Sequence, residues 1–331
     1  MAERKKFLDY AKGLGILLIM FAHSSQYFPA MEQVNEFVCS FHVPIFFVAS
    51  GYLAYYKKNT FNFKKRARVL LVPYVVYSVF NSVLKIVVLA LTHSLTKDKL
   101  QEEAVALLIT GNGTVWFLLT LFVVEMLFYI LRSCNNKRYL LSASVLIILP
   151  YFLSPFLQNP IGIVLIRIIA GLGFYVISFI TCSYIERHFQ SKRSAISVGL
   201  LVGGFLSYIK FGSRYSFFEG RFDMPWWSLC TGLLLSLGTV LFCNILEKHF
   251  EKTKIMKAIE FFGENSLIIM LIHPTILLVF TYPFAGFFGN IEGVQSTLTC
   301  ICLFLIIVLL ELPAIYIVNR WFSWTLGKRG N

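Results

Sequence analysis

The sequence predicts an all-α, polytopic integral membrane protein with about ten transmembrane helices and with both termini in the cytoplasm. Three observations lead to this fold class. The 331 residues are 57% hydrophobic and only 14% charged, with a mean hydropathy of +0.71, whereas a soluble domain is about 25% charged. Apolar stretches long enough to cross a bilayer recur along the whole chain. The basic residues gather in alternate segments between these stretches, as the positive-inside rule requires.

Ten apolar segments can be marked in order, and each is near the length that crosses a hydrocarbon core of about 30 Å. The first is the least apolar because it contains Asp9 and Lys12, and only Gln158, Asn159 and Pro160 separate the fifth from the sixth. The ten predicted spans are 8–28, 36–56, 69–92, 115–132, 139–157, 161–185, 194–210, 226–246, 262–284 and 296–319.

The placement of Lys and Arg tests this number of spans independently. With the N-terminus in the cytoplasm, 22 of the 30 basic residues fall in inner segments and 5 in outer segments. The other three, Lys12, Lys85 and Arg167, lie within spans. One missed helix would invert the pattern downstream, so the asymmetry favours ten spans. It also explains the net charge of +13 by topology, which excludes nucleic acid as a partner and leaves membrane lipid.

The seven cysteines are scattered and show no metal-ligand spacing, so we expect no metal site and no disulfide framework.

The first span carries the strongest candidate for chemistry. Eleven residues make about three helical turns, so Lys12 and His23 share a face about 16 Å apart. Lys12 then lies near the cytoplasmic surface and His23 in the outer half of the bilayer. An ionisable group at that depth is costly and suggests a functional site, although His23 by itself is also compatible with a hydrogen bond to a neighbouring helix.

A basic segment follows the second span. Lys64, Lys65, Arg66 and Arg68 form a cluster ahead of Pro73, and Arg binds phosphate through paired hydrogen bonds. The cluster therefore predicts a phosphate site beside Lys12. Ordinary topogenic charge and attraction to anionic lipid are the alternatives.

The second span contains a predicted break. Pro44 frees a backbone carbonyl within the membrane, and the pair Ser50 and Gly51 permits a close helix approach. A broken helix beside the His23 helix is what a buried polar cavity requires. His42 is a candidate to line that cavity or to pack against its neighbours.

Three further residues are candidates for the cavity or the acceptor. Trp116, at the outer mouth of the fourth span, either stacks on a sugar ring or belongs to the interfacial aromatic belt. Glu125 lies at middle depth, where it could orient an imidazole. His273 precedes Pro274 in the ninth span and again combines an imidazole with a proline inside the membrane.

At these residues the chain resembles the acyltransferase-3 family of integral membrane acyltransferases. The family hallmark is a basic residue, ten residues and then His, which Lys12 and His23 match except that Lys stands where the family usually has Arg. The segment from Phe41 to Tyr52 is similar to the pattern Phe-x-x-Pro-x-Phe-Phe-x-x-Ser-Gly-Tyr. The other similar features, in chain order, are Arg68 with Pro73, Trp116 with Phe117, and Ser266 with His273.

The subgroup that the chain resembles most is that of the sugar O-acetylases similar to fucose 4-O-acetylase. The resemblance implies transfer of an acetyl group from cytoplasmic acetyl-CoA to a hydroxyl of a cell-surface polysaccharide or a lipid-linked sugar. Acetyl-CoA would be a substrate, with no tightly bound cofactor. Its phosphates would bind Lys65, Arg66 and Arg68, with Lys12 at the channel entrance. His23 would act as a general base or as a transient acyl acceptor.

We expect residues 1–331 to form a single transmembrane acyltransferase domain without an extra soluble domain, in a bacterial inner (plasma) membrane. The oligomeric state is left open, a homo-oligomer included. The alternative from another class is a flippase or transporter for a lipid-linked saccharide. Transporters often contain paired halves with matching broken helices, and the sequence contains no such repeat. A scaffold protein would leave the polar residues of the first, second and ninth spans unexplained.

Overall fold

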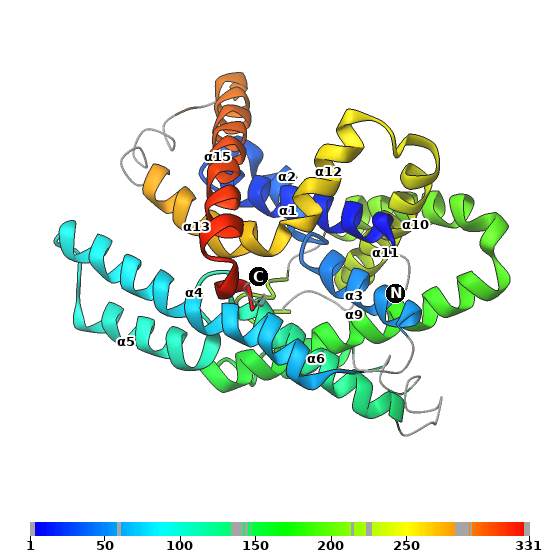
Figure 1. Ribbon diagram of the computed structural model, residues 1–331, viewed down its shortest axis with the longest axis horizontal. Helices are drawn as coiled ribbons and strands as arrows, with labels where there is room; N and C mark the ends of the chain where they lie inside the picture. The colour runs from blue at the N-terminus through cyan, green and yellow to red at the C-terminus, as the bar shows by residue number, and fades with distance from the viewer. Residues whose placement is uncertain are drawn as a thin grey trace.

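The computed structural model describes residues 4–57, 61–133, 142, 145, 147–212, 215–222, 227–281, 291 and 293–327. These residues form helices joined by short connections (Figure 1), and the only β pairing among them is an isolated bridge between Ser216 and Arg221. The predicted all-α fold is confirmed.

The long helices are α1 (Lys6–Ser25), α3 (Pro44–Tyr56), α4 (Phe63–Leu91), α6 (Trp116–Ser133), α9 (Pro160–His188), α10 (Arg193–Phe211), α11 (Trp227–Phe250), α13 (Ser266–Thr281) and α15 (Gly293–Trp321). Shorter α-helices are α2 (Glu32–Cys39), α5 (Lys97–Val105), α8 (Leu149–Leu153) and α12 (Lys254–Glu264). Single turns and short irregular helices are η1 (Pro29–Met31), η2 (Ala106–Thr110), η3 (Gln190–Lys192) and η5 (Ser323–Leu326).

Within the described ranges, eight segments are long and apolar enough to cross a membrane, or nine if one bent pair counts as a single span. Six of the 19 residues of the predicted span 139–157 lie outside the described residues, and the described ones include α8. The number of ten spans and the cytoplasmic position of both ends therefore stay predictions.

The bent pair corrects the predicted span 262–284. Helices α12 and α13 meet at Asn265 with a bend of 79°, so this segment is not one straight helix. The bend lets α12 cross over α1 (Figure 1). At the crossing, a Cβ on Gly13 would overlap the carbonyl oxygen of Ile259, and a Cβ on Gly263 would overlap that of Asp9. Glycine is thus what permits the two backbones to touch.

Helix α1 lies in the middle of the molecule. It packs against α2, α3, α11, α12, α13 and α15, and 67% of its apolar window is buried, against 11% in the peripheral helix α10. In Figure 1, α5 and the adjoining part of α4 lie toward the left, α6 lies below the centre, and α10 and α11 lie toward the right. Because α1 touches so many neighbours, its side chains lie where several helices converge.

The predicted break in the second span is confirmed. Helix α2 ends at Cys39 and α3 begins at Pro44, because proline fits the first turn of a helix but cannot continue one. The close approach predicted at Gly51 is also present, since a Cβ there would overlap the carbonyl oxygen of Tyr175 in α9. Ser178 secures this contact with a 2.7 Å hydrogen bond to the carbonyl oxygen of Val48.

Candidate active site

A cavity of about 350 Å³ lies where α1, the break between α2 and α3, the start of α6, the segment 215–218 and α13 meet. His23, His42 and Trp116 all line it. Three residues that are spread over 93 positions of the sequence therefore share one cavity. Their neighbours in the wall include Asn35, Cys39, Thr114, Tyr215 and Pro274.

Helix α1 places His23 in its last turn and Lys12 about three turns earlier. The two groups have different surroundings. His23 faces the cavity, whereas the Lys12 ammonium lies 2.9 Å from a carboxylate oxygen of Asp9. The imidazole therefore stands at one end of the helix and an ion-pair network at the other.

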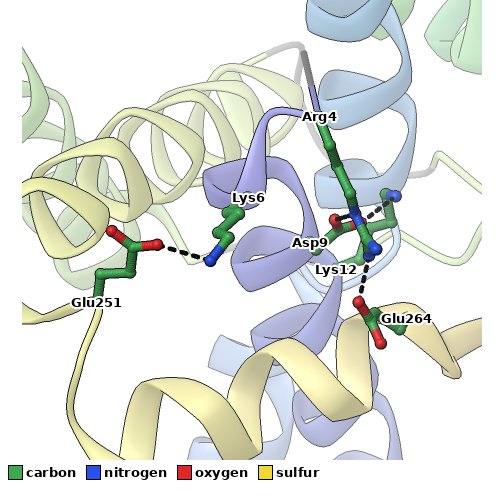
Figure 2. A network of polar contacts seen from close by, with 6 residues as sticks. All are labelled: Arg4, Lys6, Asp9, Lys12, Glu251 and Glu264. Atoms are coloured by element: carbon green, nitrogen blue, oxygen red, sulfur yellow. Dashed lines mark hydrogen bonds and ion pairs between the residues drawn. The ribbon is translucent and has the colours of Figure 1, made fainter. Parts of the chain in front are cut away.

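Figure 2 shows this network at the predicted cytoplasmic end of α1. Arg4 bridges Asp9 and Glu264 at 2.8 and 2.6 Å, while Lys6 pairs with Glu251 at 2.6 Å. Burial opposes the charge on Arg4, but its hydrogen bonds to the two carboxylates outweigh this and raise its pKa. The network ties the start of α1 to α12 and to the turn before it, which fixes the helix that carries His23.

His42 enters the cavity from the break in the second span. Its Nδ1 lies 3.0 Å from the carbonyl oxygen of Val38, which one turn of helix places within reach. A carbonyl only accepts, so Nδ1 carries the proton and Nε2 holds the lone pair in the neutral ring. Asn35, one turn before Cys39, donates to the carbonyl of Ala22 and to the hydroxyl of Ser25 and so fixes α2 on α1.

His273 does not line this cavity; its ring lies against that of His23, with centroids 5.0 Å apart and planes at 65°. Ser50 does not line it either: it is half-buried in α3 beside the close contact of Gly51 with α9. Glu125 forms a bidentate ion pair with Arg66, so its partner is a guanidinium and not an imidazole.

One wall of the cavity depends on Arg167, which the sequence analysis noted only as an intramembrane charge. Its side chain is 2% exposed and donates to the carbonyl oxygens of Thr110, Phe217 and Phe218. The guanidinium also lies 4.8 Å from the ring centroid of Trp116, and Trp116 stacks on Phe217. Arg167 thus joins two loops and an aromatic residue of the wall. An intramembrane arginine was the signal that could have found it.

The basic segment at the start of α4 lies apart from the cavity, since none of Lys65, Arg66 and Arg68 lines it. Lys65 and Arg68 are exposed. The structure adds Lys57, the residue after α3, which the sequence alone did not single out as a site residue. Partial burial, together with the positive charges of Arg66, Lys12 and Lys65, lowers the pKa of its ammonium below the usual 10.5.

Lys12, Lys65 and Arg66 lie near enough to Lys57 for their charges to act on its ammonium, so the four form a cationic cluster in which Glu125 offsets part of the charge. Such a cluster suits a phosphorylated ligand. No group of three His, Cys, Asp or Glu side chains in the described part of the chain is arranged to hold a metal ion.

Comparison with known proteins gives one match. The model of the acyltransferase-3 family, described as an acyltransferase domain, matches residues 5–317. No curated protein and no solved structure was found to match the chain. The matched region includes both helices of the broken second span, the cationic cluster and every residue that lines the cavity. The chain therefore belongs to the acyltransferase-3 family of membrane proteins.

Proposed function

We propose that this protein transfers an acetyl group from acetyl-CoA to a hydroxyl of a cell-surface polysaccharide or a lipid-linked sugar. One observation carries the proposal: helix α1 connects a cationic cluster at one end with an imidazole that faces a cavity near its other end. The family match supports acyl transfer. The donor, the acceptor and the role of each residue are our inference.

The cationic cluster suits the donor because acetyl-CoA carries phosphates at one end and its thioester at the other. Lys57 and Lys65 of the cluster would bind the phosphates together with Arg68, three residues after Lys65 in α4. Arg66 and Lys12 contribute less free charge, since Glu125 and Asp9 already pair with them. The pantetheine arm has roughly the length of the 16 Å gap from Lys12 to His23, so the thioester would reach the imidazole.

His23 would act in one of two ways. As a general base it takes the proton from the acceptor hydroxyl while the hydroxyl oxygen bonds to the acetyl carbon. The carbon–sulfur bond breaks, the sulfur keeps the electron pair, and the proton finally resides on the CoA thiol. As an acyl acceptor, a ring nitrogen first takes the acetyl group from sulfur, and the hydroxyl then displaces it from nitrogen. The products and the proton balance are the same in both routes.

The acceptor would enter from the opposite side to the donor. Trp116 lies in the cavity wall, but Arg167 already lies over its ring. Because Phe217 also stacks on this ring, we infer that Trp116 offers an edge to a sugar. A sugar acceptor agrees with the resemblance to the subgroup similar to fucose 4-O-acetylase. Its entry from the side opposite to the donor agrees with a protein of the bacterial inner membrane.

The test is thiol release from acetyl-CoA by the purified protein, with and without a panel of saccharides. The wild-type protein should release CoA, and His23→Ala should lower the rate by at least about 100-fold while the protein stays folded. His188→Ala, an exposed histidine at the end of α9, is the matched control and should keep full activity. Full turnover in His23→Ala would exclude His23 from the reaction. Saccharide movement across vesicles without consumption of acetyl-CoA would instead indicate a flippase.

A further inference from the structure

His273 has a defined tautomer. Its ring is completely buried in α13, and Nδ1 lies 3.0 Å from the carbonyl oxygen of Ile269, one turn earlier. Because a carbonyl oxygen has no proton to give, Nδ1–H is the donor in this hydrogen bond. The neutral ring therefore has its lone pair on Nε2.

That lone pair has no protein partner in the described part of the chain, although Nε2 is buried. Buried polar atoms without partners are rare, and an unmet acceptor costs free energy. The ring beside it is that of His23, at a centroid distance of 5.0 Å with an edge-on geometry. His23 lines the cavity and His273 does not, so His273 contacts the ring of His23 without being part of the cavity lining.

A neutral imidazole that works as a base or nucleophile needs its lone pair on the nitrogen that faces the substrate. Its other nitrogen then carries a proton and needs an acceptor to hold that orientation. A carboxylate often fills this place. Among the residues that the structure describes, no carboxylate hydrogen-bonds to His23 or His273, and Glu125 is engaged by Arg66.

We propose that His273 is a positioning residue: a small rotation of the two rings from the arrangement in this structure lets its Nε2, which has no partner here, accept a hydrogen bond from the ring N–H of His23 and turn the other nitrogen of His23 toward the cavity. This inference rests on the proposed role of His23. In a low-dielectric site, a neutral acceptor orients the imidazole without introducing a second buried charge.

The backbone around His273 supports a fixed position. Pro274 has no N–H, so the carbonyl of Met270 lacks its usual helical donor. The hydroxyl of Thr114 donates to that carbonyl instead. Thr114, Met270 and Pro274 all line the cavity. The helix that carries His273 is thus tied to the wall of the same cavity at the turn where the ring sits.

Two amide variants test the roles of the two ring nitrogens of His273 separately. The side chain of His273→Gln places an amide oxygen near the position of Nε2 and keeps an acceptor for His23. The side chain of His273→Asn reaches only the position of Nδ1, so it keeps a donor for the carbonyl of Ile269 and loses the acceptor. We expect His273→Gln to stay within about 10-fold of the wild-type kcat and His273→Asn to lose about 100-fold, with KM for acetyl-CoA unchanged in both.

The reverse order, with His273→Asn active and His273→Gln inactive, would show that only the bond to Ile269 matters and would overturn the proposal. An equal kcat in both variants would do the same. His188→Gln and His188→Asn are matched controls on an exposed histidine.

A measurement on the unaltered protein does not depend on the folding of any variant. Nitrogen-15 NMR of histidine-labelled protein in lipid, assigned with His23→Ala, should show a protonated Nδ1 and an unprotonated Nε2 on His273, and a coupling from Nε2 to a ring nitrogen of His23. A proton on Nε2, or no coupling, would overturn the inference. This readout is separate from turnover, so failure of the positioning role and failure of the acetyl-CoA reaction remain distinguishable.

Discussion

At the scale of single residues, the protein places opposite electrostatic demands on the two ends of α1. Near its start, cations outnumber the acids that pair with them, and these neighbouring positive charges help to lower the pKa of Lys57. Near its end, the rings of His23 and His273 meet without any hydrogen-bonded carboxylate in the described ranges. A phosphate-bearing donor suits the first environment and a neutral base suits the second.

Lys57 leads to a prediction about pH. Its pKa is lowered by burial and by neighbouring cations, so its charge is present at lower pH and is lost as the pH rises, earlier than for an ordinary lysine. The KM for acetyl-CoA should therefore rise with pH in the wild-type protein, whereas Lys57→Arg should keep its charge and flatten this rise. Lys57→Ala should raise KM by about 5-fold at neutral pH, which corresponds to about 1 kcal/mol.

Steady-state kinetics between neutral and alkaline pH measure this effect. Lys192→Arg, at an exposed residue of η3, is the control and should not change the profile. Identical profiles for Lys57→Arg and the wild type would remove Lys57 from the donor site.

At the scale of elements, the cavity exists because two helices are interrupted and two loops are clamped. The break between α2 and α3 admits His42, and the bend between α12 and α13 accompanies the crossing over α1. The segments around residues 110 and 217 both accept hydrogen bonds from the guanidinium of Arg167. The break supplies His42 and Val43 to the cavity wall, and Arg167 holds Phe217 and Phe218 there.

The three hydrogen bonds of Arg167 to backbone carbonyls lead to a prediction about stability and saccharide binding. Lysine keeps the charge but cannot reach three carbonyl oxygens at once, so Arg167→Lys should lower the free energy of unfolding by about 2 kcal/mol. It should also raise the KM for the saccharide while the KM for acetyl-CoA stays constant, because the loops form the outer wall only. Arg187→Lys, exposed at the end of α9, serves as the control. A change in the acetyl-CoA KM alone would contradict this assignment.

The crossing of α1 and α12 gives a second prediction at this scale. Gly13→Ala places a Cβ against the backbone of Ile259, which forces the helices apart and should cost about 1–3 kcal/mol. Gly199→Ala in α10 meets nothing within 4 Å, so the better helix propensity of alanine should stabilise the protein by up to about 1 kcal/mol. Thermal unfolding in detergent compares the two, and equal midpoints would show that the crossing is loose.

At the scale of the whole molecule, orientation decides whether the mechanism works. The donor cations and the cavity must face opposite sides of the bilayer, because acetyl-CoA is cytoplasmic and the proposed acceptor is not. The distribution of Lys and Arg predicts this arrangement. Helix α1 packs against three of the seven other described spans and against the bent pair α12 and α13, so we expect it to connect the two sides near the centre of the protein.

Cysteine labelling tests the orientation directly. In a background without the native cysteines, Lys64→Cys at the start of α4 and Glu219→Cys in the loop 215–222 place single thiols at exposed positions. An impermeant maleimide added to intact cells should label Glu219→Cys and should reach Lys64→Cys only after the membrane is opened. Labelling of both from the same side would refute the predicted topology.

The sequence by itself determined the all-α membrane fold, the shared face of Lys12 and His23, and the break at Pro44. These features depend on local properties, namely apolar length, helical period and the missing N–H of proline. Tertiary structure alone decided that His23 meets His273, 250 residues away, that Glu125 pairs with Arg66, and that Arg167 is held by backbone carbonyls. The physical reason is that helix packing is the sum of many weak contacts. In addition, every residue has a backbone carbonyl, so the sequence does not indicate which carbonyl a side chain will bind.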